Sequence, residues 1–397
     1  MKPLRVILVM IEPPLPFGHA TTRWSYVLLK GLVQRGHRVT AFAAPSKPQA
    51  IDEVKALFPS PEYDLRCHAH PIRNRLRSKW ETLRRPCSYM FSSSLRRELG
   101  TELEHGFDLL HLEGTWAGWL GQGNDISRSV LNVHNLYAID LPSQAPRGLG
   151  QKLRTTLQRR AESRLLRTYP MLMTVTPRLR RAVRAIAPMT PVHVVPLALD
   201  LALYPFVPSE RRPPQPVISM IGSMDWYPSR SAAVRLITRL WPAIKQRVPK
   251  ARLRIVGRNA RSALADYLGR SDLEIAENVV STRPYFEAAS VLLYAPARGS
   301  GMKVKVLEAF AYGVPVVTTT DGVEGLPAQD GVHVGLCDDD SGLIERAVLL
   351  LDDRARQEQQ RKAARQLLEQ YCDANVALDA VERCYAHILA RRAELAA

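Results

Sequence analysis

The chain has 397 residues, of which 46% are hydrophobic, and this length allows two domains with sizeable cores. No apolar run reaches the roughly 18 residues that span a bilayer. The net charge of +17 favours an anionic partner, which leaves nucleic acid, an anionic membrane face and phosphorylated small molecules open.

The first half of the chain alternates short apolar runs with helical patterns. Residues 5–11 form an apolar run typical of a strand buried on both faces of a parallel sheet, so we interpret the start as this strand and not as a signal peptide. A helix is predicted at 21–35, closed by Gly36, and a second strand at 38–43. This β-α-β opening predicts a doubly wound sheet. Further strands are expected at 107–112, 130–133, 171–175 and 192–195, and a basic helix at 177–187.

Five prolines between residues 205 and 216 predict a linker, after which the alternation restarts. The expected strands are 217–222, 251–257, 291–296 and 314–319, and the expected helices are 230–247 and 303–312. A last helix is predicted at about 375–393. The chain is therefore expected to be an α/β protein with two similar halves.

The most informative stretch is residues 292–320, LLYAPARGSGMKVKVLEAFAYGVPVVTTT. A strand is followed by a glycine-containing loop and by a helix that is expected to begin near Met302, so free N–H groups meet the charges of Lys303 and Lys305. This pattern indicates a diphosphate cradle, with Glu308 one turn further along as an acceptor for ribose hydroxyls. The alternative is an ordinary strand–helix turn with two solvated lysines.

Several segments together resemble the GT-B glycosyltransferases of the family 4 type. The matching segments are RGHRVT at 35–40, FDLLHLEG at 107–114, VLNVHN at 130–135, HVVPLALD at 193–200, IGSMDWYPSRSAAV at 221–234, ARLRIVG at 251–257, STRPYFEAASVLLYAPARGSGMKVKVLEAFAYGVPVVTT at 281–319 and GVEGL at 322–326. The long segment at 281–319 is specific, whereas the others are individually weak.

The resemblance implies a GT-B fold of two Rossmann-like, doubly wound domains that face each other across a cleft. The N-terminal acceptor domain would be residues 1–204, to which a C-terminal helix at 375–397 crosses back, and the nucleotide-sugar-binding domain would be residues 205–374. Members of the family retain the anomeric configuration and generally need no metal. The resemblance therefore implies a nucleotide-sugar donor as substrate, no cofactor and no metal site.

Donor-binding residues are carried over from the matching motifs. They are Gly222, Arg258, Val279, Ser300, Gly301, Met302, Lys303 and Glu308, with the loop at 277–280 facing the base. Ser300 stands where the common motif has the first of two glutamates, so the sequence matches a GSGxxxKxLEA subgroup. The Arg and Lys that often follow the first strand of the second domain are absent here, which shifts charge neutralisation to Lys303 and Lys305 with Arg258.

His134 and Lys305 are the expected catalytic residues. His134 follows a predicted strand, and the resemblance implies that it approaches the donor sugar; the alternative is a histidine hydrogen-bonded within a loop. On the acceptor side we expect Gly18, His19 and Arg23, from the loop after the first strand. For His111 and Glu113 a structural role is at least as well supported.

Two basic runs concentrate the positive charge in the first half, at 66–97 and 152–184. Solvated helix faces would explain them, and so would docking to anionic lipid headgroups or to a lipid-linked acceptor at the inner face of the plasma membrane. No nucleic-acid motif accompanies the charge, so nucleic acid is not expected as a partner. The five cysteines show no CxxC pair, which favours free thiols in a reducing cytoplasm, and Asp338–Asp340 are interpreted as a helix-capping turn and not as a metal site.

The sequence thus predicts a retaining, metal-independent hexosyltransferase-type enzyme of polysaccharide biosynthesis that glycosylates a saccharide, a lipid-linked or a small-molecule acceptor. A GT-B sugar-nucleotide epimerase or hydrolase would need carboxylates for proton abstraction that the sequence does not reveal. A non-catalytic nucleotide-sugar-binding subunit would not need the intact GSGMKVKVLEA string. A nicotinamide-dependent dehydrogenase is disfavoured because no GxGxxG follows the first strand.

Overall fold

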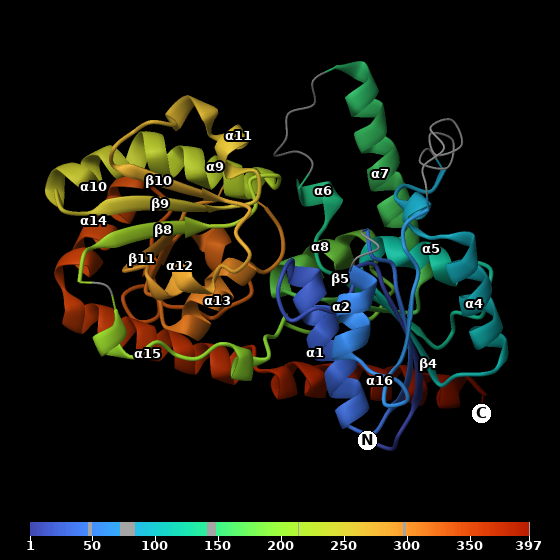
Figure 1. The fold of residues 1–397 in the computed structure, drawn as a ribbon. Helices are drawn as coiled ribbons and strands as arrows, with labels where there is room; N and C mark the ends of the chain where they lie inside the picture. Colours follow the sequence, from blue (N-terminus) through green and yellow to red (C-terminus); the bar gives the residue numbers. More distant parts are fainter. Residues whose placement is uncertain (47–49, 72–83, 141–147, 213, 297–298, 397) are drawn as a thin grey trace. The chain divides into compact units, whose positions relative to one another are not determined.

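The computed structural model describes residues 1–46, 50–71, 84–140, 148–212, 214–296 and 299–396. The chain divides into two compact units, which we call unit 1 (Met1–Asp200 with Cys372–Ala397) and unit 2 (Leu201–Tyr371). Figure 1 shows that each unit has its own sheet with helices packed against it. Two parallel sheets with helices are the predicted α/β architecture of a GT-B protein.

Unit 1 is built on a seven-stranded parallel sheet of order β3-β2-β1-β4-β5-β6-β7. Its strands are β1 (Arg5–Met10), β2 (Arg38–Ala43), β3 (Asp64–Cys67), β4 (Leu109–Glu113), β5 (Ser129–Val133), β6 (Met171–Thr174) and β7 (Val192–Val194). Its helices are α1 (Ala20–Gln34), α2 (Ala50–Leu57), α4 (Ser93–Glu104), α5 (Gly118–Gly121), α6 (Tyr137–Asp140), α7 (Leu149–Thr168), α8 (Pro177–Ile186) and α16 (Ala374–Ala396). The apolar runs that predicted strands are fully buried, as strands covered on both faces must be.

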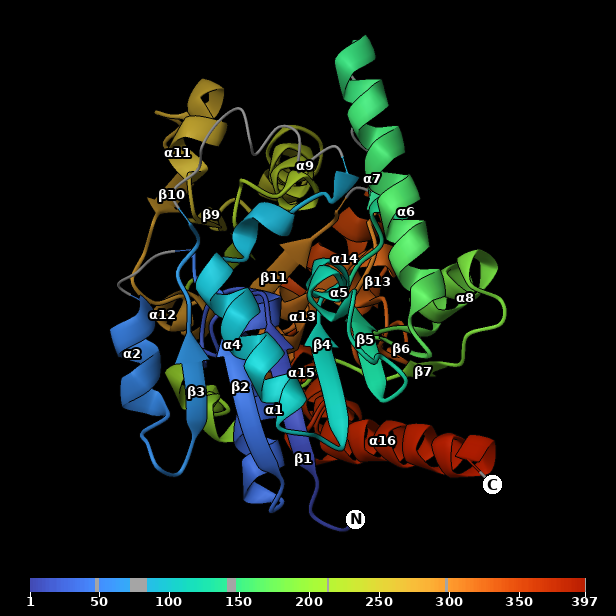
Figure 2. The same ribbon diagram turned by 90° about the vertical axis from the view of Figure 1, so that its right-hand side faces the viewer.

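Helix α16 belongs to unit 1 although 171 residues of unit 2 precede it, and it lies against α1 (Figures 1 and 2). Gly31 of α1 permits this approach, because a Cβ there would lie 2.2 Å from a Leu378 methyl. Glu382 of α16 accepts hydrogen bonds from Arg35 (2.7 Å) and from His37 Nε2 (2.9 Å). The last helix is therefore part of the first unit's core.

Unit 2 is built on a six-stranded parallel sheet of order β10-β9-β8-β11-β12-β13. Its strands are β8 (Val217–Ile221), β9 (Arg252–Gly257), β10 (Leu273–Glu277), β11 (Val291–Tyr294), β12 (Val316–Thr318) and β13 (Gly335–Leu336). Its helices are α9 (Tyr227–Arg235), α10 (Trp241–Arg247), α11 (Ala260–Ala263), α12 (Arg283–Glu287), α13 (Val304–Tyr312), α14 (Asp340–Asp352) and α15 (Arg354–Tyr371). In both sheets the strand order reverses beside the first strand, and ligands of such sheets bind outside the carboxyl ends at that point.

The predicted helix at 230–247 differs from the structure in two respects. The helix begins earlier, at Tyr227, with Pro228 in its first turn, where the missing N–H costs no hydrogen bond. A π-helical segment at Leu236–Leu240 then separates α9 from α10. Pro242 lacks an N–H and its ring crowds the carbonyl four residues earlier, so a wider turn before it relieves the clash.

Candidate functional site

The carboxyl edge of the unit 2 sheet is closely packed where β8 and β9 end. A Cβ on Gly257 would lie 1.9 Å from the carbonyl oxygen of Gly222, so only glycine lets the two strand ends approach this closely. The Gly222 amide donates to the carbonyl of Val256 (2.9 Å), and the Met224 amide donates to that of Arg258 (3.0 Å). Two of the predicted donor residues, Gly222 and Arg258, are thereby joined through the backbone at this edge.

Lys305, from the first turn of α13, reaches under this edge. Its ammonium donates to the Ser229 hydroxyl (2.7 Å) and lies 4.1 Å from the centre of the Tyr294 ring. A Cβ on Gly222 would lie 2.7 Å from Lys305 Cε, so the glycine makes room for the lysine. The described residues provide this ammonium with a hydroxyl and a ring face but with no ion pair.

The surroundings of Lys305 disfavour its charged form. Burial and then the neighbouring charge of Lys303 lower the pKa of Lys305 from 10.5 to about 7, against an opposing effect of Glu308. The residue as a whole is only half-buried, although its ammonium is densely surrounded by protein. We therefore expect a lowered pKa that an anion bound nearby would raise again.

The other predicted residues of the GSGMKVKVLEA segment lie in and around the start of α13. Ser300, Met302, Lys303 and Glu308 are buried, and Gly301 has a φ of +81° that favours glycine. The Lys303 ammonium donates to the carbonyl of Gly301 (2.5 Å) and lies 3.9 Å from a carboxylate oxygen of Glu324. The helix N-terminus, two lysines and a buried carboxylate are thus gathered within one strand–helix turn.

Arg258 and Val279 lie in the loops after β9 and β10. Arg258 is exposed, and Val279 is half-buried beside the fully exposed Val280. The two loops are tied together, because the Asn278 side chain accepts from the Asn259 amide (3.2 Å) and Glu277 accepts from the Arg261 amide (2.9 Å). The structure therefore places both residues at the same sheet edge as Gly222.

In unit 1 the loop after β1 carries the predicted acceptor residues. Gly18 has a φ of +118°, and the Arg23 guanidinium donates to its carbonyl (3.0 Å). Arg23 is buried, whereas His19 is exposed and precedes α1 as its N-cap. Arg23 therefore fastens the loop from inside, while Gly18 and His19 are its accessible residues.

His134 comes directly after β5 and contacts the last residue of β4. Its Nε2 lies 2.6 Å from a carboxylate oxygen of Glu113, and Nε2 of His111 lies 2.7 Å from the other oxygen. The Asn132 side chain donates to the same carboxylate (3.1 Å). Burial alone would raise the pKa of Glu113, but the charges and hydrogen bonds of His111 and His134 hold it well below its usual range.

The chain continues from His111 to the last helix. Nδ1 of His111 lies 2.6 Å from the hydroxyl of Tyr385 on α16. Burial raises the pKa of Tyr385 well above its ordinary value, so this hydroxyl keeps its proton. The sequence had indicated His134, had favoured a structural role for His111 and Glu113, and contained no signal for Tyr385, which lies 274 positions from its partner.

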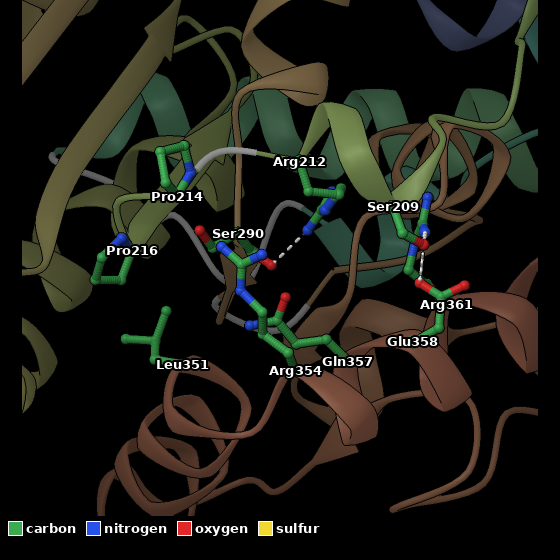
Figure 3. A pocket seen from close by; sticks show the side chains of 10 residues that line it. All are labelled: Ser209, Arg212, Pro214, Pro216, Ser290, Leu351, Arg354, Gln357, Glu358 and Arg361. Atoms are coloured by element: carbon green, nitrogen blue, oxygen red, sulfur yellow. Dashed lines mark hydrogen bonds and ion pairs between the residues drawn. The ribbon is translucent and has the colours of Figure 1, made fainter.

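A cavity of about 150 Å³ elsewhere in unit 2 shares no residue with the predicted donor set (Figure 3). It is lined by Ser209, Arg212, Pro214, Pro216, Ser290, Leu351, Arg354, Gln357, Glu358 and Arg361. Arg212 donates to the Ser290 carbonyl (2.9 Å), and Arg361 donates to Glu358 (2.7 Å) and to the carbonyl of Gly313 (2.8 Å). These guanidinium groups anchor the proline-rich segment to α15.

The Asp338–Asp340 turn caps a helix, as predicted. The Asp339 carboxylate accepts from the Gly342 amide (2.8 Å) at the start of α14, and Asp338 accepts from Thr320. Asp340 pairs with Arg235 (2.7 Å). In the part of the chain that the structure describes, no group of three His, Cys, Asp or Glu side chains converges as a metal site would require.

None of the helices among the described residues combines the length and apolar character that a membrane crossing requires. Residues 72–83 of the first basic run, with Trp80, lie outside the described residues. The second run contributes α7, whose N-terminal part extends away from the sheet of unit 1 (Figures 1 and 2). Leu149 and Leu153, one helical turn apart in that part, are 85% and 59% exposed.

Comparison with known proteins assigns each half of the chain to a family. The sequence model described as Glycosyltransferase Family 4 matches residues 21–203, and the model described as Glycosyl transferases group 1 matches residues 215–353. A search of the curated proteins found no match.

Solved glycosyltransferase structures share the fold over nearly the whole chain. Sucrose-phosphate synthase from Thermosynechococcus elongatus is 16% identical, with a TM-score of 0.71 over 97% of this chain and 99% of its own. HepE from Anabaena, solved with UDP and glucose, is 13% identical, with a TM-score of 0.68 over 96% and 100%. WaaG, a glycosyltransferase involved in lipopolysaccharide biosynthesis, is 14% identical, with a TM-score of 0.64 over 96% and 99%. At these identities the likeness establishes the GT-B fold.

Proposed function

The chain belongs to the group 1 and family 4 glycosyltransferases, and on that premise we propose that it moves a sugar from a nucleoside diphosphate sugar to an acceptor hydroxyl with retention of configuration. The observation that carries the donor assignment is the Lys305 ammonium, enclosed at the carboxyl edge of the unit 2 sheet without a carboxylate partner among the described residues. Buried charges in proteins are paired. A diphosphate supplies the missing negative charge.

The leaving group is stabilised by charge and not by a covalent intermediate. The acceptor oxygen bonds to the anomeric carbon on the face from which the diphosphate departs, and the hydroxyl proton passes to the departing diphosphate. Lys305, Lys303 and the amide groups at the start of α13 stabilise the charge that grows on that diphosphate. These groups supply the electrostatic role without a divalent metal.

The remaining donor contacts follow from the same edge. Glu308 accepts hydrogen bonds from the ribose, while the loop at 277–280 faces the base and Arg258 adds positive charge beside it. Ser300, Gly301 and Met302 present backbone amides where the common motif has a glutamate, which is the property we assign to the GSGxxxKxLEA subgroup. His134 binds a hydroxyl of the sugar.

The acceptor is a saccharide, free or lipid-linked, bound by unit 1 through the loop of Gly18 and His19. HepE was solved with UDP-glucose and TarM from S. aureus with a saccharide and UDP, which supports this pairing of substrates for a hexosyltransferase. A role in polysaccharide biosynthesis is consistent with the stated role of WaaG.

We place the enzyme in the cytoplasm, peripherally bound at the inner face of the plasma membrane. All five cysteines are free thiols, which suits a reducing compartment. The projecting part of α7 combines exposed Leu149 and Leu153 with Lys152 and Arg154, a composition that suits an anionic lipid surface.

The experiment is a thermal-shift panel of UDP-, GDP-, ADP- and dTDP-sugars, followed by product analysis with and without acceptors. A donor at about 100 times its dissociation constant should stabilise the protein by roughly 2.7 kcal/mol. Transfer should persist after EDTA treatment. Release of free sugar or of an epimer from the donor alone, with no acceptor product, would replace the proposal by the hydrolase or epimerase alternative, and binding without turnover would replace it by a binding subunit.

A further inference from the structure

The buried chain Tyr385–His111–Glu113–His134 ends in an atom with no protein partner. Nδ1 of His134 is buried and makes no hydrogen bond with any described residue. The residue itself is 9% exposed, so little water reaches the ring. An unpaired buried nitrogen costs free energy unless a ligand satisfies it.

The carboxylate of Glu113 decides which nitrogen of His134 carries the proton. An ionised carboxylate only accepts hydrogen bonds, so Nε2 of His134, 2.6 Å away, must donate its proton to it. Asn132 donates to the same carboxylate, and His111 adds a contact of 2.7 Å that lies out of line with its ring N–H bond. A neutral imidazole that is protonated on Nε2 presents a lone pair on Nδ1.

The surroundings fix both ends of this contact. Glu113 is opposite Asn132 in the register of β4 and β5, so the carboxylate is held by the sheet itself. His111 is held from α16 by the Tyr385 hydroxyl (2.6 Å). After His134, the Asn135 side chain donates to Asp140 (3.1 Å), and Glu162 of α7 accepts from the Tyr137 and Ala138 amides. The imidazole therefore has a fixed direction as well as a fixed tautomer.

We propose that Glu113 is a positioning residue that locks His134 in the Nε2–H tautomer, so that Nδ1 accepts a hydrogen bond from a hydroxyl of the sugar substrate. The assignment of a hydroxyl rests on the proposed function, whereas the tautomer rests on the geometry of unit 1 alone. An acceptor nitrogen discriminates against phosphate and carboxylate groups, which carry no proton to donate.

The test uses the full-length protein with ¹⁵N-labelled histidine. In the wild type the His134 signal, identified by its loss in His134→Gln, should show a protonated Nε2 and an unprotonated Nδ1. In Glu113→Gln the new amide donates to Nε2, so the proton should move to Nδ1. We expect kcat/KM for sugar transfer to fall about 10- to 100-fold in this variant, with UDP affinity unchanged. Glu113→Asp keeps the charge on a shorter side chain and should lose less.

Glu382→Gln is the matched control, because it breaks another histidine–glutamate pair of unit 1, His37 with Glu382 at 2.9 Å. It should leave the His134 signal unchanged and kcat/KM within twofold. A wild-type His134 protonated on Nδ1 would overturn the proposal, and so would Glu113→Gln with unaltered tautomer and kcat/KM. If Glu113→Gln does not fold, the wild-type spectrum alone decides. If the tautomers are as expected but no sugar is transferred, the proposed function fails while the positioning by Glu113 stands.

Discussion

At the carboxyl edge of the unit 1 sheet the buried charge is a carboxylate, and at the corresponding edge of unit 2 it is an ammonium. Glu113 is surrounded by donors from three side chains, and its pKa is held low despite its burial. Lys305 meets a hydroxyl and a ring, and its pKa is lowered to about 7. The first charge is compensated by the protein itself, whereas the second is left for a ligand to compensate. Two sheets of the same topology thus build a pre-oriented hydrogen-bonding group in one unit and an anion site in the other.

The largest expected effect tests the anion site. Lys305→Ala should lower kcat about 100- to 1,000-fold, the usual loss for one preorganised group that stabilises a growing negative charge. Donor affinity should fall less, because the charge on the diphosphate grows as the bond breaks. Steady-state kinetics with a titration of the free nucleotide measure both. Lys250→Ala, at an exposed lysine of unit 2, is the control. An effect confined to donor affinity would leave Lys305 a phosphate ligand without a role in turnover.

The second prediction places the ribose beside the anion site. Glu308→Gln keeps the shape of the side chain and removes its charge, so a charge-assisted hydrogen bond worth about 1.5–3 kcal/mol should be lost. Nucleotide affinity should weaken roughly 10- to 150-fold by calorimetry. Glu345→Gln, which removes a carboxylate from an exposed pair with Arg247, should leave it unchanged. Unchanged affinity in a folded Glu308→Gln protein would move the donor away from α13.

The third prediction asks whether the units also differ at their surfaces. Each basic residue near an anionic bilayer contributes about 1 kcal/mol, so Lys152→Gln with Arg154→Gln on α7 should weaken liposome binding roughly 30-fold. Flotation with anionic and neutral vesicles at two salt concentrations measures this. Lys250→Gln with Arg252→Gln removes the same charge from unit 2 and should have little effect. Equal losses from both pairs would show that net charge alone attracts the protein.

The smallest effect concerns stability. Between pH 7 and 10.5 the unfolded chain holds a proton on Lys305 that the folded protein releases, so this residue makes the wild type gain stability as pH rises. Lys305→Met removes the buried charge, and we expect Tm at pH 7 to increase by about 2–4 °C, the shift for roughly 1 kcal/mol in a domain of this size. The gain should shrink as pH approaches 10.5. A gain that is constant with pH would mean that the ammonium is not desolvated.

Periodicity and composition determined the arrangement of strands and helices in each half. Continuous apolar runs at 5–11 and 217–222 became buried parallel strands, because a strand covered on both faces must be apolar throughout. The segment at 281–319 identified the family and placed Lys305 and Glu308 on the first turns of a helix. The interruption of the helix at 230–247 was missed, since a π-turn depends on local strain around Pro242 that no apolar pattern records.

The tertiary structure alone decided which charges meet. His111, Glu113 and His134 lie on neighbouring strands, yet only the register of β4 with β5 turns them toward one carboxylate. Tyr385 joins them because α16 returns to unit 1 after the whole of unit 2. Ser229 and Tyr294 enclose Lys305 in the same way, from segments that are distant or unremarkable in the sequence. Such contacts depend on packing distances of a few ångströms, and a linear pattern fixes the kind of residue at an edge but not its partner.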